Sequence, residues 1–221
     1  MATYFVSKLG DDSAAGTSTS TSWLTVDKAA STAVSGDIVY IAPGTYREQV
    51  TNDNSGNITY NPFIVHRIIF IGDTQLTQNW PSSIKGGVVR ITAAAAGTEL
   101  PGGTVKVWNM NSKNNISLWN VICDGSQGSI DSTTAGDSWG IAGGTSRCNV
   151  HNCVGIGAKY GIGATIVLGS LGFGGYIGIN ATEAIDCVAA GYVYSLYGWD
   201  SCFRNCVVFH GNYGISGGNR S

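Results

Sequence analysis

The sequence predicts a right-handed parallel β-helix, because a short segment containing a sharp turn recurs along its second half. Four ten-residue segments align on an Asn or Asp that is followed at once by an apolar residue. They are ISLWNVICDG (116–125), CNVHNCVGIG (148–157), TEAIDCVAAG (182–191) and SCFRNCVVFH (201–210), aligned on Asn120, Asn152, Asp186 and Asn205. A turn that recurs in this way indicates the stacked coils of a solenoid.

Two further observations favour the same fold. A second element keeps the register, because a Tyr follows at the same distance after each of Cys153, Cys187 and Cys206. Apolar residues alternate before each turn, which is the period of a strand with one face inside. Asn and Asp also suit the left-handed or bridge conformation of a corner. The side chains expected to point inward are Leu118 and Ile116, Val150 and Cys148, Ala184 and Thr182, and Phe203 and Ser201.

The aligned turns at positions 120, 152, 186 and 205 are unevenly spaced, and the last interval is the shortest. This shortest interval lies in the range of one solenoid coil with few insertions. The two longer intervals are therefore expected to be single coils that carry loops. On this basis residues 102–221 form the regular part of the solenoid.

The first hundred residues predict one helix among strands. Trp23, Val26, Ala29-Ala30 and Ala33-Val34 fit an amphipathic helix of about three turns. Ser35-Gly36-Asp37 then ends this helix, since Gly is favoured at a helix C-terminus. The other expected elements are a strand at 4–6, a polar loop at 7–22 and strands at 38–41, 45–50, 63–71 and 88–92.

The opening residues also follow a pattern known from other chains. Gly10 and Asp11 follow a first strand, a short helix spans 25–33, and the runs Gly36-Asp37-Ile38-Val39 and Pro43-Gly44-Thr45-Tyr46-Arg47-Glu48 come next. This pattern resembles the start of right-handed parallel β-helix proteins of the pectate-lyase-like superfamily. The resemblance implies the fold and a helix that covers the N-terminal mouth of the solenoid, but it does not specify an activity. With Gly72-Asp73-Thr74 and 88–92 added, the block also resembles β-helix structural proteins encoded by tailed phages.

One domain over residues 1–221 is therefore expected, divided into three parts. Residues 1–50 hold the first strand, the capping helix and the first coil, residues 51–101 hold early coils with loops, and residues 102–221 hold the regular coils. Each end of a solenoid exposes unpaired backbone groups and apolar core, so it must be covered or paired. A helix at 24–34 covers one end, whereas 214–221 shows no capping helix, and a partner, another copy or a folded-back tail is expected there.

Composition argues against nucleic-acid and membrane partners. Charged residues make up 12% of the chain, against roughly 25% in ordinary domains, and the net charge is −2 without any Lys/Arg run. No nucleic-acid binding and no membrane insertion are therefore expected. The apolar stretch 161–179 is interrupted by seven glycines and suits strands and turns. Met1-Ala2 leads straight into a strand, so no secretory signal is expected in the given chain.

The cysteines predict packing rather than metal binding. Three align at one inward position, where Val121 stands in an earlier coil, and two more have inward parity. This ladder of buried free thiols is Cys123, Cys148, Cys153, Cys187 and Cys206. Their spacing contains no C-x-x-C, and parity places His151 on the opposite face from Cys148, so no metal site is predicted. Cys202 points outward, and an intermolecular disulfide and an exposed thiol both stay open for it.

Candidate catalytic groups are scattered. Enzymes of the superfamily that the opening resembles use clustered carboxylates, some of them with calcium. The acids of the repeat region are Asp124, Asp131, Asp137, Glu183, Asp186 and Asp200. Only Glu183 and Asp186 lie close in sequence, and Asp186 occupies a corner. His66 and His210 have no evident carboxylate or nucleophile partner, so no catalytic residue and no cofactor are predicted.

Aromatic residues are the remaining candidates for binding. Several fall on outward parity and suit stacking on sugar rings or on a neighbouring protein, although aromatic ladders on a flat face explain them equally well. The set is Trp108, Trp119, Trp139, Tyr160, Tyr176, Tyr192, Tyr194, Tyr197, Trp199 and Tyr213.

Together these patterns favour a non-enzymatic structural or attachment protein of a virion or another extracellular particle, such as a capsid decoration or a tail or spike component of a phage. It is expected to dock or self-associate through β-helix ends and aromatic faces. The expected partners are further copies, including a trimer, other particle proteins and surface polysaccharide. Candidate interface residues are Tyr192, Trp199, Cys202, Tyr213, Ile215 and Arg220. Two alternatives stay open: a polysaccharide lyase or glycoside hydrolase, and a surface carbohydrate-binding adhesin.

Overall fold

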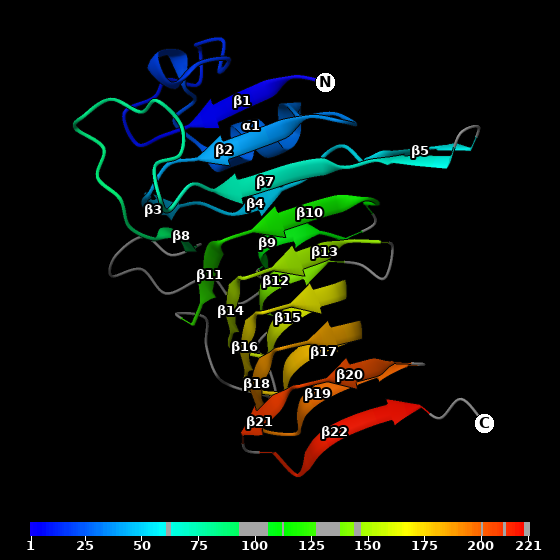
Figure 1. The fold of residues 1–221 in the computed structure, drawn as a ribbon. Coiled ribbons are helices and arrows are strands. Elements are labelled where there is room, and N and C mark those ends of the chain that lie inside the picture. The colour runs from blue at the N-terminus through cyan, green and yellow to red at the C-terminus, as the bar shows by residue number, and fades with distance from the viewer. Residues whose placement is uncertain are drawn as a thin grey trace.

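The computed structural model describes residues 1–60, 63–92, 106–111, 113–126, 138–143, 147–199, 201–209 and 211–218, without the side chains of 57–66, 199 and 218. Within these residues the protein is predominantly β, with two parallel sheets, one antiparallel strand pair and one α-helix. The sheets run the length of the molecule from the N-terminus at one end to the C-terminus at the other (Figure 1). This architecture is compatible with a β-helix.

The larger sheet consists of two rows of strands that share β15 and β17. The first halves of these two long strands lie in one row and their second halves in the other. The first row holds β4 (Val50–Thr51), β9 (Lys106–Met110), β12 (Trp139–Gly143), β15 (Tyr160–Leu168), β17 (Ile177–Ile185), β19 (Tyr194–Trp199) and β22 (Tyr213–Gly218). The second row holds β1 (Thr3–Val6), β2 (Ile38–Ile41), β7 (Ile68–Gly72), β10 (Ile116–Trp119) and β13 (Asn149–His151), then β15, β17 and β20 (Cys202–Arg204).

The smaller sheet takes one strand from each passage of the chain. Its strands are β3 (Gly44–Arg47), β8 (Val89–Thr92), β11 (Val121–Gly125), β14 (Val154–Gly157), β16 (Leu171–Gly174), β18 (Val188–Gly191) and β21 (Val207–Phe209). We call one passage through the smaller sheet, the first row and the second row a coil. Successive coils lie side by side in parallel register, as Figure 1 shows for β14 to β18.

The coil count differs from the sequence prediction between Asn152 and Asp186. This interval is not one coil with a loop, because the second half of β15 and the whole of β16 pair within it. It holds two coils of equal length, with Gly169 halfway along it at the intermediate corner (φ 55°). The sequence alignment missed this corner, because it used Asn or Asp to identify corners and this one is a glycine. Between Asn120 and Asn152, most of the residues that connect the paired strands, namely 127–137 and 144–146, lie outside the described residues.

The corner residues share one backbone conformation. Asn120, Asn152, Asp186 and Asn205 have φ values of 58°, 50°, 55° and 50°. This left-handed region costs most residues about 1–2 kcal/mol, and Asn and Asp tolerate it best after Gly. Neighbouring corners also touch, because Nδ2 of Asn152 donates to Oδ1 of Asn120 at 2.9 Å.

The predicted N-terminal helix is shorter than expected. Helix α1 spans Val26–Thr32, and a 3₁₀ turn, η1 (Thr19–Thr21), precedes it. Thr25 caps α1 by accepting from the Lys28 amide, and the Glu48 carboxylate accepts from the Val26 and Asp27 amides at 3.1 and 2.8 Å. The helix lies at the N-terminal end of the stack beside β1, β2 and β4 (Figure 1).

The predicted strand over 63–71 is divided in two. Strand β6 (Phe63–His66) pairs antiparallel with β5 (Asn57–Tyr60), and only β7 joins the larger sheet. The β5–β6 pair projects beyond the sheets (Figure 1). The His66 side chain lies outside the described set.

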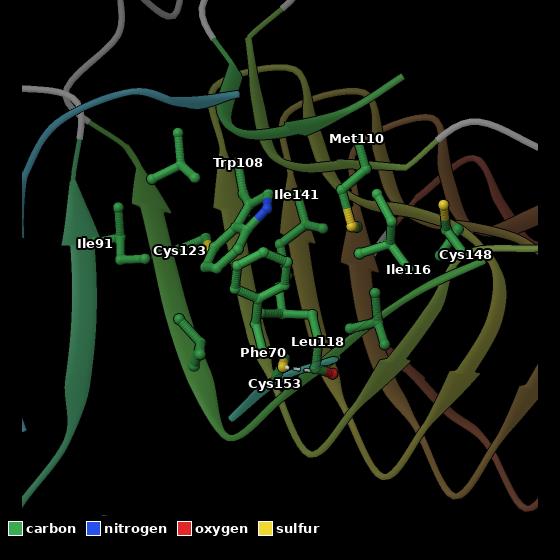
Figure 2. Packing of buried hydrophobic residues seen from close by; sticks show 14 of the residues in the cluster. Phe70, Ile91, Trp108, Met110, Ile116, Leu118, Cys123, Ile141, Cys148 and Cys153 are labelled. Atoms are coloured by element: carbon green, nitrogen blue, oxygen red, sulfur yellow. Dashed lines mark hydrogen bonds between the residues drawn. The ribbon is translucent and has the colours of Figure 1, made fainter. Parts of the chain in front are cut away.

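The core fills the space between the sheets with side chains from every coil. Figure 2 shows Phe70, Trp108, Leu118 and Cys153 converging there, with the Phe70 and Trp108 rings edge to face at 5.1 Å. Trp108 is fully buried, so it is not among the aromatic candidates that point outward. Its Nε1 donates to Oδ1 of buried Asn52 at 2.8 Å, which satisfies the polar atom of the indole.

The cysteine ladder lies inside, and its thiols also donate weak hydrogen bonds. Cys123, Cys148, Cys153 and Cys187 are buried, Cys206 in the last coil is half-buried, and all five are free. The Sγ atoms of Cys153, Cys187 and Cys206 lie 3.1–3.2 Å from the carbonyl oxygen two residues earlier. Ser170 occupies the same position in the overlooked coil, and its Oγ donates to Leu168 O at 2.8 Å. In these coils the position after the corner therefore takes a small side chain, either Cys or Ser, that donates a hydrogen bond to the backbone.

The expected inward parity fails at one residue. Ile116, Leu118, Val150, Cys148 and Ala184 are buried, whereas Thr182 is exposed. Strand β17 passes from the first row to the second near this point, so the alternation does not continue through it. Phe203 and Ser201, in the last coil, are half-buried.

Glycines allow strands of the smaller sheet to approach the first row of the larger sheet closely. A Cβ placed on Gly161 would lie 2.5 Å from the amide nitrogen of Phe173, and one on Gly178 would lie 2.7 Å from that of Ala190. Side chains at these positions would force the two backbones apart. Gly161 and Gly178, two of the glycines that interrupt the apolar stretch 161–179, therefore serve the packing of strand against strand.

Candidate functional site

The C-terminal end of the stack exposes apolar side chains, and one of them belongs to a column that is buried in the preceding coils. Ile162, Ile179, Leu196 and Ile215 occupy one register column of the first row. The first three are at most 1% exposed, whereas Ile215 is 57% exposed. Three further side chains of this end are about half exposed or more: Val207, Phe209 and Tyr213.

Backbone groups are also unpaired along this end. Among the described strands, β20 pairs only with β17, β21 only with β18 and β22 only with β19. Their outer edges therefore present N–H and C=O groups that a further strand could use. We call the outer surface of β20, β21 and β22 the C-terminal edge.

Three of the six interface candidates lie on the C-terminal edge with described side chains. Tyr213 and Ile215 both lie on β22 and are 57% exposed. Cys202 on β20 is exposed and lies 3.4 Å from Nε of Arg204, which can donate to its sulfur. Tyr192 is 73% exposed at the turn between β18 and β19, beside the edge rather than on it. The Trp199 side chain and Arg220 lie outside the described residues.

The three acidic candidates that the structure describes, Asp124, Glu183 and Asp186, occupy structural positions. Glu183 lies 3.7 Å from Arg204, and Asp186 forms a corner. Asp124 pairs with Arg90 and accepts from the Ser126 amide. Burial acts to raise the pKa of Asp124, but the bonds from Ser126 and Arg90 outweigh it and hold the pKa below its ordinary value. Asp131, Asp137 and Asp200 lie outside the described residues.

Among the histidines, only His151 has a described side chain. His151 stacks on Trp119 with ring centroids 3.8 Å apart and planes within 2°. Burial, together with the positive charge of Arg67, lowers the pKa of His151 below its ordinary value, so the imidazole is neutral at pH 7. His210 falls outside the described residues. Over the part of the chain that is described, no group of three or more His, Cys, Asp or Glu side chains is placed to hold a metal ion.

A second surface, which the sequence did not assemble, is a cleft lined by aromatic rings. It lies over β12, β15, β17 and β19 in the first row and has a volume of about 290 Å³. We call it the aromatic cleft, and its lining residues are Trp139, Tyr160, Tyr176, Ile177, Asn180, Tyr194 and Tyr197. The aromatic members were all singled out individually in the sequence.

Strand register and a glycine position the cleft residues. Trp139, Tyr160, Ile177 and Tyr194 occupy successive strands at one register position. A Cβ on Gly163 would lie 2.5 Å from Cζ3 of Trp139, so the indole rests where only glycine leaves room. The signal available in the sequence was the shared register of Tyr160 and Tyr194. The intervening coil, which was not recognised, places Ile177 at this register and Tyr176 one residue before it.

Comparisons with known proteins find no match to this chain. No protein-family model matches the chain, and searches of curated proteins and of solved structures find no similar protein. In the described residues no helix is both long and apolar enough to span a membrane. A functional assignment therefore depends on the two surfaces themselves.

Proposed function

We propose that the protein is a right-handed β-helix that serves as a non-enzymatic structural or attachment component of a virion or other extracellular particle. In this proposal it associates with further copies of itself through the C-terminal edge. The observation that carries the proposal is the contrast between Ile215, 57% exposed, and the residues of its own column that the next coil covers.

The C-terminal edge has the two properties that an added strand requires. Its outer backbone groups are unpaired in the described residues, and exposed Ile215 lies in a column whose other members belong to the core. Main-chain hydrogen bonds would supply affinity, and the apolar side chains would supply buried area. A second copy presents both features, so two edges related by a twofold axis can pair with each other.

Charge favours association between identical chains. The net charge is −2 and only 12% of residues are charged, so copies repel one another little. At the edge itself, Arg204 and Glu183 lie close enough to offset each other. A trimer, or contact with another particle protein, would use the same exposed strands.

The mechanism is mechanical rather than chemical. Parallel strand ladders and a continuous core make a rigid body, and the C-terminal edge supplies the contact. The resemblance of the opening residues to phage-encoded β-helix proteins supports a particle component.

Light scattering of the purified chain tests association directly. The wild type is expected to show a mass that is a multiple of the 23.0 kDa of one chain. Ile215→Lys is expected to shift it to the monomer, because a charge on an edge strand blocks pairing. Val34→Lys is the matched control, since Val34 is 52% exposed and lies after α1, at the opposite end.

Two results would contradict the proposal. A monomeric wild type, or association that Ile215→Lys leaves intact, would remove the C-terminal edge as the contact. Release of reducing or unsaturated sugars from polysaccharides, with or without calcium, would instead identify an enzyme and direct attention to Glu183, Asp186 and Asp200.

A further inference from the structure

The aromatic cleft has the form of a small-molecule site, and it adjoins the C-terminal edge because Tyr194 of the cleft stacks on Tyr213 of β22 with ring centroids 5.4 Å apart. We propose that it binds a neutral saccharide, with one pyranose ring stacked against its tyrosines. The volume of about 290 Å³ lies near the lower end of the roughly 300–1,000 Å³ typical of ligand pockets. The cleft therefore suits a single ring of a saccharide, with the rest of the chain outside.

The rings form adjoining aromatic surfaces at different angles. Tyr176 stands nearly perpendicular to both neighbours, at 84° and 6.0 Å from Tyr160 and at 83° and 5.9 Å from Tyr194. Trp139 extends this surface by stacking on Tyr160 at 4.1 Å and 21°. A pyranose ring has a face of C–H groups, which packs on an aromatic face, and a rim of hydroxyls, which does not.

Polar atoms of the cleft suit hydroxyl groups. Asn180 contributes an amide, which both donates and accepts hydrogen bonds, and the tyrosines carry phenolic O–H groups with the same capacity. Ligand sites typically combine apolar walls with a few such polar groups. Saccharide hydroxyls likewise donate and accept, so they match these partners.

The charge of the cleft favours a neutral sugar over an acidic one. Its lining residues include no Asp, Glu, Lys or Arg. Lys159 lies beside the cleft, with its Nζ 5.3 Å from the centre of the Tyr160 ring. The lining offers no guanidinium group to pair with the charge of a uronic acid or a phosphorylated sugar. A neutral sugar ring carries no charge and requires no such partner.

The cleft is held in place by the backbone. The Tyr176 amide donates to Lys159 O at 2.8 Å, and the Tyr194 amide donates to Tyr176 O at 3.0 Å, so neighbouring coils position these rings. Gly163 leaves the room that the Trp139 indole occupies. A site built before the ligand arrives loses little conformational freedom on binding.

Calorimetric titration tests the proposal on the full chain with a defined panel. The probes are cello-, malto-, manno- and xylo-oligosaccharides as neutral sugars and oligogalacturonate as the acidic comparator. At least one neutral probe is expected to bind, and Tyr176→Ala is expected to raise its Kd about tenfold. Tyr176→Phe, which keeps the ring, is expected to retain most of the affinity. Gly163→Ala is expected to weaken binding by displacing Trp139.

Tyr192→Ala is the matched control, because Tyr192 is an exposed tyrosine that does not line the cleft. Its affinity is expected to equal that of the wild type. Thermal melting checks that each variant is folded, and Tyr194→Ala repeats the test if Tyr176→Ala melts early. The proposal is overturned if no neutral probe binds, if only oligogalacturonate binds, or if folded Tyr176→Ala and Tyr194→Ala both bind as the wild type does.

Discussion

The two ends of the stack differ in what covers their apolar residues. At the N-terminal end, helix α1 lies against the first strands, and Val26, Ala29 and Ala30 are fully buried. At the C-terminal edge, Ile215 is 57% exposed although the other members of its column are buried. Both ends have apolar residues in helices or strands, so the apolar nature of a residue does not by itself decide whether it is buried. The presence of a covering element does.

This difference concentrates stability in the covered coils. A residue in a middle coil is packed by neighbours on both sides, whereas one in the last coil is packed on one side. In repeat architectures stability is a sum of coil and interface contributions, so the last coil is the one that opens at the lowest cost. Substitutions test this contrast, from the largest expected effect to the smallest.

Ala30→Asp in α1 is expected to cost about 3–5 kcal/mol, because it places an unpaired carboxylate where no water reaches. Urea unfolding followed by circular dichroism measures the loss. Lys28→Asp on the same helix is the control, since Lys28 is only half-buried and acids are tolerated in the first helical turn. Equal losses for the two variants would show that α1 does not seal the core.

Ile179→Ala is expected to cost about 2–5 kcal/mol by leaving a cavity, whereas Ile215→Ala in the same column is expected to cost under about 1 kcal/mol. Both are measured by urea unfolding at a protein concentration where the wild type is monomeric. A large loss for Ile215→Ala in the monomer would mean that the last coil is as well covered as the middle.

Asn152→Ala is expected to cost about 1–2 kcal/mol, because Ala tolerates the left-handed φ of 50° less well than Asn and loses the bond to Asn120. Asn152→Gly is expected to be milder, since Gly169 takes the same corner in the next coil. Asn205→Ala in the last coil is expected to lower hydrogen-exchange protection of β20 and β21 more than global stability. Equal stability of the Ala and Gly variants at 152 would contradict a strain-based account.

Cys187→Ser is expected to change stability by under about 1 kcal/mol at pH 7, because Ser170 makes the equivalent bond. A loss well above this from thermal or urea unfolding would show that the sulfur packs in a way that an oxygen cannot replace.

Alkaline pH separates buried from exposed thiols. Burial raises the pKa of Cys153 to about 12 and that of Cys187 to about 11, from 9.0. Folding therefore favours the protonated thiols, and this contribution is complete below pH 9 and lost as the pH rises toward 11–12. Urea midpoints are expected to fall above pH 9, and less steeply in Cys187→Ser. A thiol reagent at pH 8 is expected to modify Cys202, which is exposed, before either buried thiol.

Local features of the stack were readable from sequence. Asn120, Asn152, Asp186 and Asn205 were identified as corners, and their backbone is left-handed. Inward parity placed the cysteine ladder but misassigned Thr182, because β17 changes rows there. The coil through Gly169 was overlooked, since Gly and Ser170 replace the Asn and Cys on which the alignment depended.

The aromatic cleft could not be assembled from the sequence alone. Tyr160 and Tyr194 were known to share a register, which the extra coil fills with Ile177, and only the structure shows that the ring of Tyr176 contacts both tyrosine rings. The position of Trp139 across Gly163 required coordinates, because it depends on the space that a neighbouring strand leaves.

The amino-acid sequence by itself determined the corners, the alternation of strands and the buried thiols. These depend on each residue's own Cβ, polarity and nearest neighbours along the chain. The tertiary structure alone decided how many coils form and which rings meet in the cleft. Those outcomes depend on the length of each coil, because that length sets which residues of successive coils lie side by side.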